Sequence, residues 1–94
     1  MRKEKKANKI NEILDIPKEI GSNKPKITII GFNELLIENY RGMLEYEECF
    51  IKINTHIGTI DINGVNLELT EMTTDDILIT GNLDCIKFEE EISP

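Results

Sequence analysis

The stretch Gly58-Thr59-Ile60-Asp61-Ile62-Asn63-Gly64-Val65-Asn66-Leu67-Glu68-Leu69-Thr70 decides the fold class. Apolar and polar residues alternate on both sides of Asn63-Gly64, and this period of two is typical of half-buried β-strands. Asn and Gly both tolerate positive φ, as a type I′ turn requires, so the stretch predicts a tight hairpin at Asn63-Gly64. The residues expected to face inward are Ile60, Ile62, Val65, Leu67 and Leu69, and those expected to face water are Asp61, Asn66, Glu68 and Thr70.

Similar runs fill the rest of the chain after residue 26. Gly81-Asn82 separates two of them and predicts a second tight hairpin, because glycine at the first turn position suits a type II′ turn. Eight such runs, at residues 27–30, 34–38, 42–47, 49–55, 58–62, 65–70, 76–80 and 83–89, follow one another at similar spacing. We therefore expect a mainly β fold, an antiparallel β-sandwich or roll of about eight short strands.

The N-terminal part has a different period. Ala7, Ile10, Ile13 and Leu14 fall on one stripe at helical spacing, so the pattern predicts an amphipathic helix. Pro17 is expected to break the helix or to start a short further turn. The predicted organisation is a basic helix over residues 1–20, a linker over 21–26, a β-sandwich-like domain over 27–90 and a tail over 91–94.

Charge is distributed unevenly along the 94 residues, which are enough for one domain. The net charge is −7, but residues 1–26 carry +4 and residues 27–94 carry −11. An acidic body repels phosphates, so no nucleic-acid partner is expected. The basic helix is a candidate for contact with a protein partner or an anionic membrane, and a solvated helix start is the alternative. The candidate contact residues are Arg2, Lys3, Lys5, Lys6, Lys9, Ile10, Ile13 and Leu14.

No residue pattern points to catalysis, a metal or a cofactor. His56 is the single histidine and is expected in a turn, while Cys49 and Cys85 are expected to be reduced thiols that pack as small hydrophobes. The abundant carboxylates indicate a solvated surface, and the glycines form no phosphate-binding motif. Neither a transmembrane run nor a signal-peptide pattern is present, so a cytoplasmic location is expected. A ligand or metal site would require Cys49, Cys85 and His56 to converge.

Five segments, at residues 6–19, 25–31, 35–42, 53–58 and 69–81, follow one another along nearly the whole chain. Taken together in this order, they resemble the YabP/YqfC family of sporulation proteins. The resemblance implies a β-sandwich-like fold and a role in the mother cell of endospore-forming bacteria. It also implies a YqfD-type membrane protein as partner, and it carries over no catalytic residue.

We therefore expect a non-enzymatic interaction or assembly module that acts in the mother cell with a membrane-associated partner, peripheral to the forespore membrane. Self-association is a further expectation, because small sandwiches have edge strands. Two alternatives stay open: a small-ligand or metal-binding β domain, and an acidic regulatory protein that sequesters a basic partner. The apolar stripe of the predicted helix is expected either to cap its own sheet or to dock onto a partner.

Overall fold

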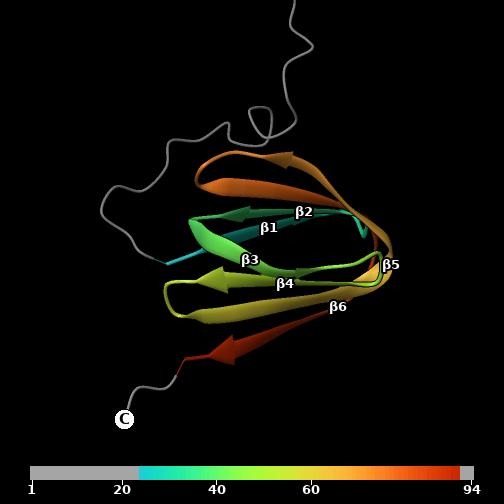
Figure 1. The fold of residues 1–94 in the computed structure, drawn as a ribbon. Coiled ribbons are helices and arrows are strands. Elements are labelled where there is room, and N and C mark those ends of the chain that lie inside the picture. Colours follow the sequence, from blue (N-terminus) through green and yellow to red (C-terminus); the bar gives the residue numbers. More distant parts are fainter. Residues whose placement is uncertain (1–23, 92–94) are drawn as a thin grey trace, which may run out of the picture.

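The computed structural model describes residues 24–91, which form one antiparallel sheet of six strands (Figure 1). Neighbouring strands follow the order β1-β2-β6-β5-β4-β3. The strands are β1 Lys26–Ile30, β2 Glu34–Glu38, β3 Tyr40–Tyr46, β4 Phe50–Thr55, β5 Gly58–Met72 and β6 Asp76–Glu90. The mainly β, antiparallel expectation is confirmed. The predicted helix over residues 1–20 lies outside the described residues.

Two long strands make the sheet fold over on itself. β5 and β6 have 15 residues each, and both bend near their middle (Figure 1). In what we call layer one, residues 68–72 of β5 and 76–80 of β6 lie beside β2 and β1. In layer two, residues 58–63 of β5 and 83–90 of β6 lie beside β4 and β3. The inner faces of the two layers enclose the core.

The count of about eight strands is wrong, because two predicted hairpins are bends within continuous strands. Gly64 is paired with Leu83 and Val65 with Asn82, so β5 and β6 remain partners through both expected turns. The register shifts between Asn63 and Gly64 and again between Val65 and Glu68. Such bulges bend the bulged strand and increase its local twist. At these two bends, positive φ values occur at Asn66 (56°) and Gly81 (137°).

The core consists of isoleucine and leucine from both layers. Its nine buried members expose at most 2% of their surface. They are Leu35, Ile37, Ile51, Ile53, Ile60, Ile62, Leu67, Ile77 and Ile79. The inward direction predicted for Ile60, Ile62 and Leu67 is confirmed, and Leu69 packs against this cluster.

One prediction of side-chain direction and one of side-chain exposure fail in β5. Val65 is 56% exposed, because the bulge before it changes the face that its side chain occupies. Asp61 lies between the inward-facing Ile60 and Ile62 and therefore points to the outer face as predicted, but it is only 7% exposed. Its register neighbours are Lys52 of β4 and Lys87 of β6, and its Oδ1 has no hydrogen-bond partner in the part of the chain that the structure describes.

Hydrogen bonds from β3 close one side of the folded sheet. The Tyr46 hydroxyl accepts a hydrogen bond of 3.0 Å from the Leu69 amide, so the end of β3 lies against layer one. Near the start of β3, the Tyr40 hydroxyl donates to the Thr73 carbonyl at 3.1 Å. The Leu67 amide also donates to the Glu48 carbonyl at 2.7 Å. β3 and the turn after it therefore close this side of the folded sheet with hydrogen bonds.

Candidate functional site

The opposite side is an open seam between β1 and residues 83–90 of β6. Two backbone hydrogen bonds tie its narrow end, from the Gly81 amide to the Asn33 carbonyl (3.2 Å) and from the Leu83 amide to the Phe32 carbonyl (2.9 Å). Beyond this point the two strands separate. Within the sheet of residues 24–91, β1 is an edge strand, and residues 83–90 of β6 pair only with β5. Two free strand edges therefore border the seam.

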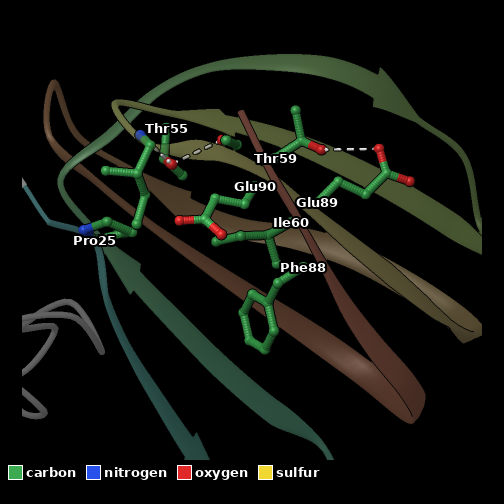
Figure 2. A pocket seen from close by; sticks show the side chains of 9 residues that line it. Pro25, Thr55, Thr59, Ile60, Phe88, Glu89 and Glu90 are labelled. Atoms are coloured by element: carbon green, nitrogen blue, oxygen red, sulfur yellow. Dashed lines mark hydrogen bonds between the residues drawn. The ribbon is translucent and has the colours of Figure 1, made fainter. Parts of the chain in front are cut away.

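A groove of about 290 Å³ lies at the wide end of the seam (Figure 2). Pro25, just before β1, forms one side, and Ile60 and Phe88 form part of the apolar surface opposite. The remaining lining residues are Thr55, Ile57, Gly58, Thr59, Glu89 and Glu90. A second, smaller hollow of about 200 Å³ lies nearer the narrow end, between Ile29 and Ile86.

Aromatic side chains are exposed along this seam. Phe88 is the register partner of Ile60 and so lies on the inner face of layer two, yet it is 67% exposed. Phe32, in the turn between β1 and β2, is 86% exposed, and Ile29 of β1 is 51% exposed. The inner-face residues Phe88 and Ile29 stay in water because the opposite layer does not extend over them. Exposed apolar side chains that gather along one side of a protein are typical of interaction sites.

The rim of the groove is acidic. Glu89, Glu90 and Glu91 follow Phe88 at the end of β6, and all three are exposed. The Thr59 hydroxyl donates to Glu89 Oε1 at 3.4 Å, on the face of layer two opposite to Phe88, and Glu90 lies on the same face as Phe88 (Figure 2). Arg41 of β3 lines a neighbouring hollow together with the three glutamates. An apolar floor with carboxylates around it suits a ligand segment that combines apolar and cationic side chains.

The turn from β4 to β5 gives the groove a fixed wall. The Thr55 hydroxyl, 2% exposed, donates to the Gly58 carbonyl at 2.7 Å and accepts from the Ile57 amide at 3.2 Å. The Glu91 amide donates to the Ile57 carbonyl at 2.9 Å. Both the turn and the end of β6 are therefore held in place by hydrogen bonds.

Comparison with known proteins places the chain in a family. The model of the YabP family matches residues 21–94. The chain belongs to the YabP family. It is also similar to the uncharacterized protein YqfC of Bacillus subtilis (strain 168), with 28% identity over 89 residues, covering 95% of this chain and 96% of that protein. No solved structure matches the chain.

The family membership predicted from the sequence is thus confirmed, and the seam is a feature of this YabP-family chain that sequence reasoning missed. In the sequence, Phe88 is one residue of an alternating run, and nothing in that run indicates that its side chain stays uncovered. Pro25 falls in the predicted linker over residues 21–26. The alternation itself carries no information about which strand edges remain free, because that depends on pairing between distant segments.

The structure does not bring His56 to the cysteines in this YabP-family chain. Cys49 precedes β4 and His56 follows it, so the length of that strand, about 20 Å at 3.3 Å per residue, separates them. Cys85 is paired with Asn63, five residues along β5 from Gly58, at the end of the strands remote from His56. Both cysteines are exposed free thiols rather than packed hydrophobes.

Two features are absent from the residues that the structure describes. Within 24–91, no cluster of three or more His, Cys, Asp or Glu side chains has the arrangement of a metal site. The same residues include no helix long and apolar enough to cross a membrane. The contact residues predicted in the N-terminal segment, from Arg2 to Leu14, lie outside the described part of this YabP-family chain.

Proposed function

We propose that this chain is a non-enzymatic interaction and assembly module of sporulation, and that its open seam binds an extended segment of a protein partner. The observation that carries the proposal is the apolar groove with the exposed Phe88, which lies between two free strand edges. Membership of the YabP family supports the sporulation context. A YqfD-type membrane protein, implied by the resemblance, is the partner to be looked for first.

The free edges favour recognition by strand addition. A peptide that adds to a sheet edge gains main-chain hydrogen bonds, and pockets for alternate side chains provide specificity. β1 and residues 83–90 of β6 offer such edges on the two sides of the groove. Phe88 and Ile29 offer apolar surface for the inward-pointing side chains of the added strand.

The acidic rim selects the chemistry of the bound segment. Glu89 and Glu90 line the groove, so a segment with alternating apolar and Lys or Arg residues is complementary to it. A second copy of this chain would bring its own acidic strand end to the seam, and like charges placed close together are unfavourable. The proposed occupant is therefore another protein, and self-association is an outcome for the test to detect.

Contact with the forespore membrane through the N-terminal segment is a separate part of this proposal. Arg2, Lys3, Lys5, Lys6 and Lys9 supply positive charge, each contributing about 1 kcal/mol close to an anionic surface. Flotation of the full chain with anionic vesicles, at low and high salt, tests it. Salt-sensitive binding is expected, and an absence of binding at low salt contradicts a membrane contact.

The seam is tested by placing a photo-crosslinking amino acid at position 88 of the full chain in sporulating cells. Position 65 serves as the matched control, because Val65 is comparably exposed but lies outside the seam. We expect position 88, and not position 65, to crosslink to one protein of the membrane fraction. Equal capture at both positions contradicts a seam-specific partner, and crosslinks to the chain itself alone would replace it with self-assembly.

A second candidate function, sequestration of a basic partner, rests on the charge of −11 over residues 27–94. It differs from the first in requiring no apolar groove. Replacing Phe88 by serine should abolish binding of a segment in the groove and leave electrostatic sequestration nearly unchanged. Raising the salt concentration should weaken sequestration much more strongly than binding in the groove.

A further inference from the structure

Two leucines on the outer face of layer one are completely buried. Leu36 of β2 and Leu78 of β6 are register partners, and both have 0% exposure. Side chains alternate between the faces of a strand. Since Leu35 and Ile37 point into the core, Leu36 must point away from it, and the same reasoning applies to Leu78. Neither leucine belongs to the core cluster.

Neighbouring strands do not explain this burial. Thr28 of β1 and Glu71 of β5 flank the leucine pair within the sheet. Neighbours in a sheet stand beside a side chain, whereas full burial requires a layer packed on top. All six described strands belong to this one sheet, and layer two packs on its inner face. The covering layer must therefore come from outside residues 24–91.

Charged groups around the leucines indicate what kind of layer covers them. Glu38 and Asp76 are register partners on the same outer face, only 5% and 4% exposed. Burying carboxylates is costly unless cations or hydrogen-bond donors lie close to them. Lys26 is the register partner of Glu38 on the other side and is itself exposed. A fitting cover presents apolar residues over the leucines and further basic residues beside the carboxylates.

We propose that this cover is the N-terminal segment of the chain itself, residues 1–23, with Ile10, Ile13 and Leu14 over Leu36 and Leu78. The segment holds six Lys or Arg residues beside its apolar stripe. It joins the described chain at Lys24, immediately before β1, the strand next to β2. The segment is therefore attached at the edge of layer one, the layer whose outer face it would cover.

The C-terminal end of β6 lies in the other layer. Glu90 pairs with Gly58 in layer two, twelve residues beyond Leu78 on a bent strand, so the chain after it starts away from the leucine pair. The seam, in contrast, is not covered, because Phe88 remains 67% exposed. The N-terminal segment thus serves the outer face of layer one and leaves the seam available, so this inference does not depend on the proposed function.

Thiol protection in the full chain tests the inference. With Cys49 and Cys85 replaced by serine, Leu78→Cys places one thiol under the proposed cover, and Phe88→Cys places one in the open seam. We expect the thiol at 78 to react with a thiol reagent about tenfold or more slowly than that at 88. Adding Ile13→Asp and Leu14→Asp should remove most of this protection. A matched control pair carries the same added charge away from the stripe, with Asn8→Asp on the opposite face of the predicted helix and Ser22→Asp in the predicted linker, and it should leave the protection intact.

Carbodiimide crosslinking of the unmodified chain gives a second readout that requires no core substitution. Crosslinks within one chain are expected from Lys6, Lys9 or Lys18 to the acidic residues of the outer face. A mixture of isotopically light and heavy chains separates these from crosslinks between chains. Protection at 78 that is unaffected by Ile13→Asp and Leu14→Asp overturns the proposal. So do crosslinks that are only between chains, which would assign the cover to a second copy.

Discussion

The backbone carbonyl of Asn82 lies so close to Gly64 that it would clash with the Cβ of any other residue at position 64. The two residues belong to β5 and β6 at the point where both strands bend. The close approach of the backbones is what allows one pair of strands to serve both layers. Gly64 is therefore required by a contact with a distant strand rather than by a turn conformation.

Replacing Gly64 by alanine should destabilise the fold by roughly 1–3 kcal/mol, the usual range for forcing an extra methyl into a packed site. Either β6 must move or the bend must open. Urea denaturation of the full chain measures the change. Gly42→Ala is the matched control, because a Cβ at that position meets nothing within 4 Å. Equal stability of the two variants would show that the bend tolerates a side chain.

Replacing Tyr46 by phenylalanine should loosen the closed side of the folded sheet. The change removes the acceptor of the 3.0 Å hydrogen bond from the Leu69 amide and keeps the aromatic ring. A loss of about 0.5–1.5 kcal/mol is expected for one such bond. Hydrogen exchange at the Leu69 amide should accelerate more than exchange at core amides of β4. Unchanged protection of Leu69 would mean that β3 does not hold layer one in solution.

Replacing Thr55 by valine should weaken the wall of the groove. The buried hydroxyl makes two hydrogen bonds in the turn between β4 and β5, and valine preserves its shape but makes neither. A loss of about 1–3 kcal/mol is expected, because the Gly58 carbonyl and the Ile57 amide lose their partner. Thr59→Val is the control, since its hydroxyl makes only a 3.4 Å bond near the surface. Similar denaturation midpoints for the two variants would contradict this role.

Both cysteines should react with a thiol reagent in the native protein. Cys49 and Cys85 are exposed and free, and access limits thiol reactivity once some thiolate is present. Titration without denaturant should therefore count both thiols, and adding denaturant should raise the rate without raising the total. A native count below two would indicate that one thiol is covered or oxidised in solution.

The alternation of apolar and polar residues determined the β character of this protein and most of its inner face. Ile60, Ile62 and Leu67 lie inside as their spacing predicts, since a period of two follows from the geometry of a single strand. The same local reasoning explains the failure at Val65. After a bulge, each side chain points to the opposite face of the sheet until the next shift in register. The bulge arises in the pairing of β5 with β6, so the sequence of β5 alone does not reveal it.

Segments such as 6–19 and 69–81 were enough to predict membership of the YabP family, because they resemble it in order along the chain. Only the tertiary structure decided that Asn63-Gly64 bends a strand instead of ending it. It also decided that Phe88 stays exposed at an open seam, and that His56 and the cysteines lie apart. These outcomes depend on which distant segments pair and how closely their backbones approach, and a local pattern of side chains does not contain that information.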